Sequence, residues 1–544
     1  MNSIRIFAMI PLKWFALLVL SVAGVAFADS DRAYASDHNT AHSDFQQTGP
    51  ACTIASFRSL PAVRVISVEK EAEPVPHCKL LGVIGNDTYF ELLLPDNWNG
   101  KFVMGGGGGF VGSVVNAAQD WFGALQKGYA TVGTDTGHQA HSLDASWALN
   151  NLERLVSFGH QAVHRTAVNS KALIENFYDR EVDRSYFAGC SRGGGQALME
   201  AQRYPEDFDG IVAMSPAYNW THELGARWIR IAQLMYPDPT RIEEPVIGPE
   251  ALNLIGTAVR AQCDDLDGLS DGVLNDPRQC DFDVSSLSCS EAKTSKCLSE
   301  QQLAAAEAIY EDFEIGGQVI RGTPVGAEWP GTPLGWELWY TGGYESGDDL
   351  NYHEGTDSGE FMAPAVPNGT WAFSTGIFRY FLYNDPDWNY VGYDFSDFAQ
   401  RAARVAQTLN ADNPDLSDFR SRGGKLIIDN GWMDGSMSAY GTIQYYERVL
   451  EFDPTASEDV RLFIRPGVTH CNIGPGPDGT DYLDAINDWV ESGKAPEKLP
   501  ALYRSPVGQE TGGGRILCAW PNVVRYRGDG DSKDPSSFFC SENE

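Results

Sequence analysis

The stretch Tyr186-Phe187-Ala188-Gly189-Cys190-Ser191-Arg192-Gly193-Gly194-Gly195 decides the fold of this chain. An apolar run of strand character leads into Gly189-x-Ser191-x-Gly193, and residues 196–203 have helical composition. Strand, sharp turn and helix in this order are the context of a nucleophile elbow, where the turn leaves no room for a Cβ atom beside the serine. The pattern places the Ser191 hydroxyl at a helix N-terminus, where the backbone N–H of Arg192 can face a developing oxyanion. A chance match in a glycine-rich loop is the alternative.

Strand-like and helix-like segments alternate on both sides of this stretch. The expected strands are 90–94, 101–104, 129–132, 208–214, 425–429 and 460–464, and the expected helices are 159–177, 440–450 and 482–491. Such alternation predicts a mostly parallel sheet with helices on both faces. Between 217 and 419 the alternation stops, and Asp, Gly, Pro and Trp become frequent. We therefore expect an α/β core in two parts, 51–216 and 420–544, with an inserted lid domain at 217–419 and a cleft where they meet.

The N-terminus has the pattern of a secretory signal peptide. Arg5 and Lys13 precede the short apolar run 14–22, and small residues follow it up to Ala28. We expect residues 1–28 to be cleaved off, followed by a flexible lead-in at 29–50. A membrane anchor is the alternative, but the apolar run is short for a bilayer. The pattern predicts a soluble protein that is secreted or periplasmic and has no membrane partner.

Charge and cysteine content narrow the function further. The formal net charge of −34 at pH 7 argues against nucleic acid and anionic membranes as partners. Ten cysteines in an exported chain favour disulfides over metal thiolates. Close spacing favours local pairs, although spacing alone does not fix the pairing: Cys263/Cys280, Cys289/Cys297 and Cys518/Cys540. Nothing in the sequence indicates an organic cofactor or an obligate protein partner.

An activated serine needs a histidine that takes its proton and a carboxylate that orients the histidine. In this architecture the acid follows the serine and the histidine comes last. His470 is the one histidine after the second part of the core resumes, and it lies in a loop after the strand 460–464. Asp434, in the turn after the strand 425–429, is the expected acid. Asp429, at the end of that strand, is the rival, although its position favours a structural hydrogen bond.

Two further features surround this expected triad. Cys190 precedes Ser191 and Cys471 follows His470, so contact between serine and histidine would bring the two cysteines within bridging distance. Two unrelated buried thiols are the alternative. The run 105–109 consists of glycines, which let the backbone approach a substrate oxygen closely, so we expect a second oxyanion N–H from Gly106 or Gly107. A flexible loop is the alternative there.

An acidic stretch at 263–273 has the composition of a cation site. Carboxylates at Asp264, Asp267 and Asp271, completed by the carbonyl groups of Leu269 and Val273, suit a hard cation that takes oxygen ligands. The stretch lacks the spacing and the closing glutamate of an EF-hand. No histidine or free thiolate is nearby, and exported compartments supply calcium, so we expect structural Ca²⁺. A solvated acidic turn is the alternative.

These motifs together resemble the tannase and feruloyl esterase family over most of the chain, from about Cys52 to Cys540. The most specific signs are Gly189-Cys190-Ser191-x-Gly193-Gly194, Gly431-x-x-Asp434 and His470-Cys471. The resemblance implies an α/β-hydrolase core, the triad Ser191, Asp434 and His470, and calcium at the 264–273 loop. It also implies the disulfide pairs Cys190–Cys471, Cys52–Cys78, Cys263–Cys280, Cys289–Cys297 and Cys518–Cys540. Arg192 and Asn430 depart from the family, in which Thr and His are frequent at these positions.

The sequence therefore predicts an exported serine esterase that acts on small aromatic esters of hydroxycinnamoyl, galloyl or terephthaloyl type. The alternative from another class is a calcium-dependent protein that binds phenolic or plant-wall ligands without turnover. The sequence does not distinguish among the three kinds of ester.

Overall fold

The computed structural model describes residues 50–290, 295–329, 331–332, 334–342, 366–504 and 510–542. The expected signal peptide at 1–28 lies outside these residues, as does the expected lead-in up to residue 49. The fold is that of the unit Gly49–Glu544. No helix in the described part of the chain combines the length and the apolar character that crossing a membrane requires.

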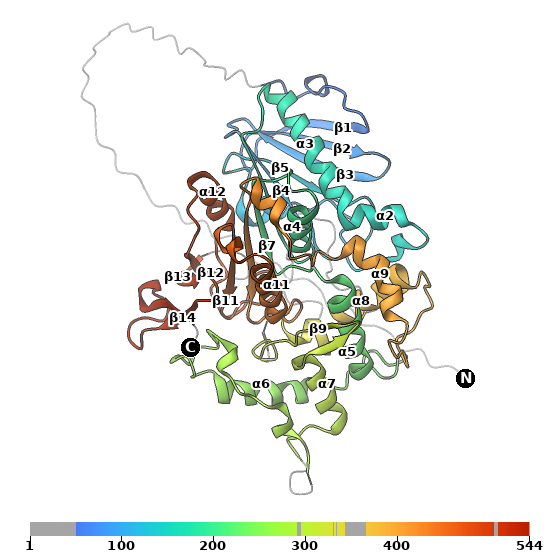
Figure 1. Ribbon diagram of the computed structural model, residues 1–544, viewed down its shortest axis with the longest axis vertical. Helices are drawn as coiled ribbons and strands as arrows, with labels where there is room; N and C mark the ends of the chain where they lie inside the picture. Colours follow the sequence, from blue (N-terminus) through green and yellow to red (C-terminus); the bar gives the residue numbers. More distant parts are fainter. Residues whose placement is uncertain are drawn as a thin grey trace, which may run out of the picture. The chain divides into compact units, whose positions relative to one another are not determined.

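A nine-stranded sheet forms the centre of this unit, in the order β1-β2-β3-β5-β4-β6-β7-β10-β11 (Figure 1). Strands β1, β2, β3 and β5 pair antiparallel, whereas β5, β4, β6, β7, β10 and β11 pair parallel. The bounds are β1 (Val63–Glu71), β2 (His77–Ile84), β3 (Thr88–Pro95), β4 (Lys101–Gly105), β5 (Ala130–Thr134), β6 (Arg184–Cys190), β7 (Gly210–Met214), β10 (Lys425–Gly431) and β11 (Val460–Arg465).

Helices cover both faces of the sheet, because its parallel strands are apolar on both sides. One hydrophobic cluster joins the sheet to α3 (Ala162–Tyr178), α4 (Arg192–Arg203) and α11 (Ala439–Phe452). A second cluster joins the opposite side to α1 (Ala117–Phe122) and α12 (Tyr482–Ser492). This layered arrangement is the α/β-hydrolase fold, so the predicted fold class is confirmed.

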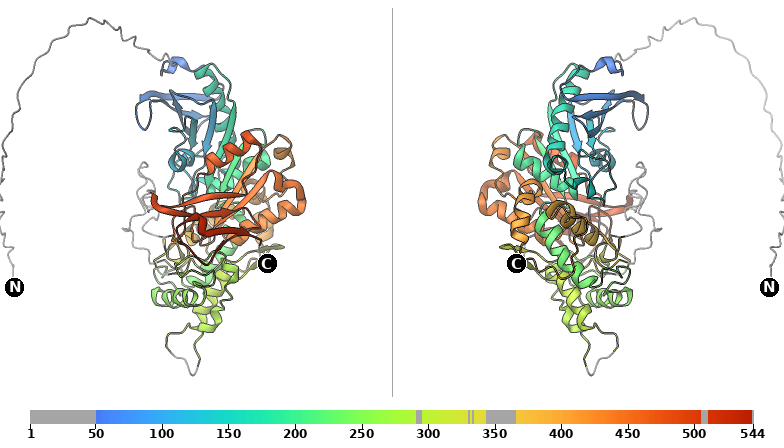
Figure 2. Two further views of the ribbon diagram at one scale, coloured as in Figure 1. Left: turned by 90° about the vertical axis from the view of Figure 1, so that its left-hand side faces the viewer. Right: turned by 90° about the vertical axis from the view of Figure 1, so that its right-hand side faces the viewer.

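Between β7 and β10 the chain leaves the sheet and forms a largely helical segment with its own hydrophobic cluster. Figure 2 shows α6 and α7 of this segment, in light green, at the opposite end of the unit from β1. The elements are π-helical turns at Trp220–Arg227, Glu337–Thr341 and Ile377–Leu382, with α5 (Trp228–Met235), α6 (Pro249–Cys263), α7 (Glu300–Tyr310), β8 (Phe313–Ile315), β9 (Gln318–Ile320), α8 (Gly369–Gly376), α9 (Phe398–Leu409) and α10 (Ser417–Ser421).

The remaining elements lie outside the nine-stranded sheet. A small antiparallel sheet pairs β12 (Lys498–Arg504) with β13 (Glu510–Cys518), and another pairs β14 (Val523–Tyr526) with β15 (Phe538–Ser541). Helix α2 spans Leu152–Val156 and continues through a π-helical turn at Ser157–Gln161 into α3. Each strand expected from the sequence overlaps an observed one, whereas β1, β2, β8, β9 and β12 to β15 were not expected.

Candidate active site

Ser191 occupies a strained turn between β6 and α4. Its φ of 60° lies in the left-handed region, which residues other than glycine rarely adopt. The glycines beside it are required by space. A Cβ atom at Gly189 would lie 2.7 Å from the backbone carbonyl carbon of Gly193, and one at Gly193 would lie 3.1 Å from the Cα atom of Gly106. The local geometry is therefore that of a nucleophile elbow, with the serine at the N-terminus of α4.

His470 and Asp434 contact each other in loops that follow neighbouring strands. The Nδ1 atom of His470 lies 2.9 Å from Oδ2 and 3.1 Å from Oδ1 of Asp434. Asp434 is fully buried, and its Oδ1 also accepts the backbone N–H groups of Ser436 and Met437 at 2.8 and 2.9 Å. This carboxylate is held rigidly, so it fixes the orientation of the imidazole ring.

The other imidazole nitrogen of His470, Nε2, makes no hydrogen bond within the described residues. Nε2 is buried and has no hydrogen-bond partner among the described residues, so no hydrogen bond joins it to Ser191. The ring of Trp339 packs edge-on against the imidazole, with ring centroids 5.1 Å apart. Catalytic hydrogen bonds in unliganded sites are often open and close only around a substrate.

A disulfide joins the residues next to Ser191 and His470. Cys190 and Cys471 are bridged, with their Cα atoms 5.7 Å apart. Because neighbouring Cα atoms are about 3.8 Å apart, the Cα atoms of Ser191 and His470 are separated by at most about 13 Å. The other bridges join the pairs that the family resemblance implied: Cys52–Cys78, Cys263–Cys280, Cys289–Cys297 and Cys518–Cys540.

Asp429, the rival acid, belongs to a separate buried network. Its carboxylate pairs with the Arg465 guanidinium, at 2.7 Å from Oδ1 to Nη2 and 2.8 Å from Oδ2 to Nε. The hydroxyl of Tyr482 donates to the same carboxylate. Asp429 therefore neutralises a buried arginine, and no interaction links it to His470 in the described structure.

A cleft opens beside Ser191, and most of its wall is aromatic or aliphatic. Ser436 and Met437, which follow Asp434 in the chain, also line it, so the serine and the acid loop meet at one cavity. The lining residues are Gly109, Ser191, Arg192, Ala217, Trp220, Leu224, Trp228, Trp339, Phe373, Ser436 and Met437. Sequence reasoning singled out the tryptophans but missed Phe373, Ser436 and Met437. Only the position of Ser436 and Met437 directly after Asp434 could have indicated them.

The expected oxyanion donors differ in how they are bonded. Arg192 is the first residue of α4, where backbone N–H groups have no partner within the helix. In contrast, the N–H of Gly106 donates to the Ala188 carbonyl oxygen at 2.9 Å, and that of Gly107 donates to the Gln196 side chain at 3.1 Å. Both glycine amides are therefore occupied, contrary to the expectation. Gly109 lines the cleft with Ser191, and no described residue accepts a hydrogen bond from its N–H.

The side chain of Arg192 is buried without a carboxylate partner among the described residues. Its guanidinium donates to the carbonyl oxygens of Phe158 and Gly159, and it lies 4.3 Å from the ring centroid of Phe158. Burial lowers the pKa of this arginine to about 9. The guanidinium is thus held by the π-helical turn before α3, and the departure from the family at this position adds no exposed charge to the cleft.

Asn430, the second departure from the family, is also fully buried. Its side-chain amide donates to the Met437 carbonyl oxygen at 3.1 Å and to the Thr442 hydroxyl at 2.8 Å. These bonds support the loop that carries Asp434. The asparagine is therefore a part of the scaffold.

The acidic loop at 264–273 contains oxygen donors only, which fit calcium by their chemistry. Backbone N–H groups hold its carboxylates: Gly272 donates to Asp264 at 2.7 Å, Leu269 to Asp267 at 3.1 Å, and Val273 to Asp271 at 3.1 Å. Asp271 also pairs with Arg515, which ties the loop to β13. The oxygens of Asp264, Asp267 and Asp271 do not all lie within 4.8 Å of one another. The structure thus brings the five expected ligand residues into one loop without gathering the three carboxylates.

Comparisons with known proteins identify relatives over most of the chain. A family model described as tannase and feruloyl esterase matches residues 76–541. A mono(2-hydroxyethyl) terephthalate hydrolase of Piscinibacter sakaiensis is 32% identical over 525 residues, which are 86% of this chain and 85% of the relative. A probable feruloyl esterase of Arthroderma benhamiae is 33% identical over 473 residues, covering 83% and 82% of the two chains. The crystal structure of feruloyl esterase B from Aspergillus oryzae superposes with a TM-score of 0.75 at 25% identity, covering 89% of this chain and 98% of that one.

Proposed function

This chain belongs to the tannase and feruloyl esterase family, and from that premise we propose that it is a serine carboxylesterase. It hydrolyses esters of aromatic carboxylic acids through an acyl-enzyme. The observation that carries the proposal is the pairing of His470 with Asp434 in loops that a disulfide ties to the Ser191 elbow. The cleft beside Ser191, which Ser436 and Met437 of the Asp434 loop also line, supports the proposal.

In the proposed reaction, Nε2 of His470 takes the proton from the Ser191 hydroxyl as the serine oxygen attacks the ester carbonyl carbon. Asp434 accepts a hydrogen bond from the Nδ1–H group of His470 and stabilises the imidazolium. The carbonyl oxygen becomes an oxyanion, which the N–H groups of Arg192 and Gly109 stabilise. The bond to the alcohol oxygen then breaks, and His470 gives its proton to the leaving alcohol. Water, activated by the same histidine, releases the aromatic acid and regenerates the serine.

Aromatic side chains support the proposed substrate class. Trp220, Trp228, Trp339 and Phe373 line the cleft beside Ser191, and such rings pack well against an aromatic acyl group. All four belong to the segment between β7 and β10. We therefore propose that residues 217–419 act as a lid domain that sets the acyl specificity.

A burst experiment tests the mechanism. With a short p-nitrophenyl ester, the wild-type protein should release about one equivalent of p-nitrophenol per chain before the steady state, as expected for an acyl-enzyme. Ser191→Ala should abolish both burst and turnover. Ser421→Ala, an exposed serine on α10, is the matched control and should retain both. A Ser191→Ala variant that still turns over would refute the proposal, and binding of phenolic esters without turnover by the wild type would favour the binding-protein alternative.

The choice among aromatic esters needs a direct comparison. We propose that methyl ferulate, methyl gallate and the terephthalate monoester be assayed side by side with the same preparation. The preferred substrate is the one with the highest kcat/KM, because this ratio reports binding of the transition state. Equal and very low values for all three, beside high activity on aliphatic esters, would overturn the aromatic assignment.

We also propose that the 264–273 loop binds structural Ca²⁺ and that the protein is exported. Ca²⁺ accepts six to eight oxygen ligands, and the loop supplies carboxylates and carbonyl groups within ten residues of the chain. Removal of calcium with a chelator should lower the Tm, and Ca²⁺ but not Mg²⁺ should restore it. Asp267→Asn should make the Tm insensitive to the chelator.

Five disulfides fit an oxidising compartment. Mature protein recovered outside the cytoplasm with an N-terminus near Asp29 would support export, and cytoplasmic retention with residues 1–28 intact would contradict it.

A further inference from the structure

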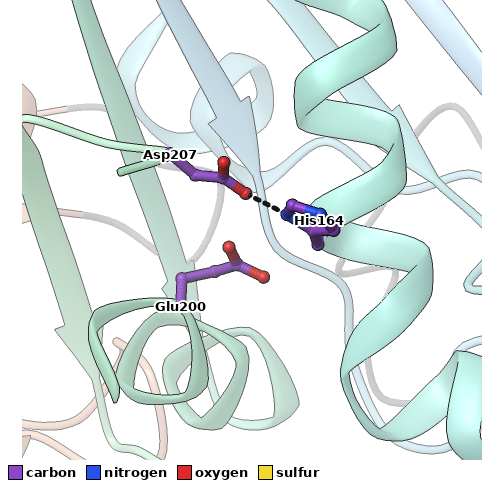
Figure 3. A group of neighbouring side chains, drawn as sticks. All are labelled: His164, Glu200 and Asp207. Carbon is purple, nitrogen blue, oxygen red and sulfur yellow. Dashed lines mark hydrogen bonds and ion pairs between the residues drawn. The ribbon is translucent and has the colours of Figure 1, made fainter. Parts of the chain in front are cut away.

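A second group of polar side chains is buried at the far end of α4 from Ser191. His164 lies on α3, Glu200 on the third turn of α4, and Asp207 in the turn between α4 and β7. Figure 3 shows the three side chains pointing toward one another from these separate parts of the chain. One potential ligand atom from each lies within 4.8 Å of the other two. At about 1.5 Å of rise per residue, Glu200 is about 13 Å along the helix from Ser191, so this group is separate from the proposed active site.

Glu200 is the unusual member of the group. Its side chain is fully buried, no N–H or hydroxyl group of the described residues donates to its carboxylate oxygens, and the Asp207 carboxylate lies beside them. Burial and the nearby Asp207 carboxylate hold the pKa of Glu200 well above its usual range. A buried carboxylate without a donor is costly, so this position requires either a bound proton or a cation.

The cationic and polar neighbours do not meet this need. Lys171 donates to the backbone carbonyl oxygen of Asp207, and burial lowers the pKa of its ammonium group. His160 is bonded to the hydroxyl of Tyr204 at 2.6 Å. The ring of Tyr204 stacks on that of His164 with centroids 3.9 Å apart, and it offers no donor to Glu200.

We propose that His164, Glu200 and Asp207 bind one divalent transition-metal ion, with Zn²⁺ as the best match. One imidazole and two carboxylates are ligands that Zn²⁺ accepts, and the nitrogen ligand distinguishes this site from an all-oxygen calcium loop. Metal–ligand bonds of about 2.0–2.2 Å place two ligand atoms no more than about 4.4 Å apart, so the side chains need only small adjustments.

Access and proton balance are compatible with this site. The His164 side chain is 29% exposed, which provides an entry path and room for water as a fourth ligand. Its Nδ1 atom lies 2.6 Å from Oδ2 of Asp207, which is hydrogen-bond distance. Metal binding releases the Glu200 proton to solvent, because a carboxylate binds in its deprotonated form, whereas the neutral imidazole binds through one ring nitrogen and keeps its proton on the other. The ion would tie α3, α4 and the entry to β7 together.

The test uses the purified wild-type protein, stripped with a chelator and returned to buffer with excess Ca²⁺ so that the acidic loop stays saturated. Titration with Co²⁺ should bind one equivalent per chain, give visible d–d absorption bands, and be reversed by Zn²⁺. Glu200→Gln and His164→Asn should each lower the Co²⁺ affinity by at least about 100-fold, since loss of a supporting residue alone costs 10–100-fold. His160→Asn, a neighbouring histidine outside the group, should bind like the wild type.

Two results would overturn the proposal. If the wild-type protein bound neither Co²⁺ nor Zn²⁺ stoichiometrically, Glu200 would carry a proton instead. Alternatively, Glu200→Gln could bind with unchanged affinity, which would place the metal elsewhere. The wild-type titration decides the question even where a variant fails to fold, and a Zn²⁺-dependent rise in the wild-type Tm is a second readout.

Discussion

Replacing Cys190 and Cys471 together by alanine tests whether their bridge both stabilises the fold and positions the base. The bridge joins residues separated by 281 positions, so its removal frees a very long loop in the unfolded chain. Loop-closure entropy predicts a loss of about 5–6 kcal/mol of unfolding free energy. The Cys52–Cys78 bridge spans only 26 positions, and its removal should cost about 3.5 kcal/mol. This pair is the matched control, because Cys78 lies in β2, four strands away from β6 in the sheet.

Thermal unfolding and steady-state kinetics measure the two effects separately. An unfolding entropy of about 2.1 cal/mol/K per residue makes 1 kcal/mol worth about 1 °C of Tm for a unit of this size. The Tm should therefore fall by about 5 °C in Cys190→Ala/Cys471→Ala and by about 3 °C in Cys52→Ala/Cys78→Ala. The first double variant should also lose about 100-fold in kcat, since a shift of about 1 Å between serine and histidine is that costly.

The control variant should keep its kcat. If Cys190→Ala/Cys471→Ala retained full activity while losing the expected Tm, the bridge would be a stabilising link without a role in positioning. If the Tm fell by the same amount in both double variants, the argument from loop length would be refuted.

Three further predictions concern single residues. Asp434→Asn should lower kcat by about 10⁴-fold at nearly unchanged Tm. Asp429→Asn should lower the free energy of unfolding by about 3–5 kcal/mol, because it leaves Arg465 buried and unpaired. Steady-state kinetics and unfolding curves of both variants test this, and the reverse pattern would exchange the two roles. Burial raises the pKa of Glu328 from 4.5 to about 7, so its contribution to stability is complete below pH 4.5 and is lost as the pH rises to 7, by about 3 kcal/mol. Glu328→Gln should flatten that decline in unfolding curves recorded across this pH range, and an unchanged slope would contradict the assignment. Gly189→Ala places a Cβ atom 2.7 Å from the backbone of α4 and should cost about 1–3 kcal/mol or more together with most of the activity, so a stable, active variant would argue against a tight elbow.

Local patterns were enough to predict the strands of the sheet that lie beside the elbow. The runs 101–104, 425–429 and 460–464 are short, apolar and bounded by turn residues, and they fall within β4, β10 and β11. β1 and β2 escaped prediction because exposed and buried residues do not alternate regularly along them. β1 also contains a register shift between Val65 and Ser67, which interrupts the two-residue period that identifies a strand.

The order of residues along the chain selected Asp434 and His470, which the structure brings into contact. The choice of Asp434 over Asp429 as the acid depended on Arg465 and Tyr482. Both contact Asp429 in the folded protein, and no local sequence pattern encodes such a tertiary contact. The glycine run showed a similar limit. Its composition indicated a close backbone approach, but only the bonds to Ala188 and Gln196 show that the amides of Gly106 and Gly107 are occupied.

The late return of the chain to the sheet has a consequence for biosynthesis. β10 and β11 pair beside β7 only after about two hundred intervening residues have been made, and they carry the proposed acid and base. A chain that ended before β10 would therefore contain Ser191 without the proposed acid and base. Competence to react would depend on the pairing of β10 with β7 and of β11 with β10.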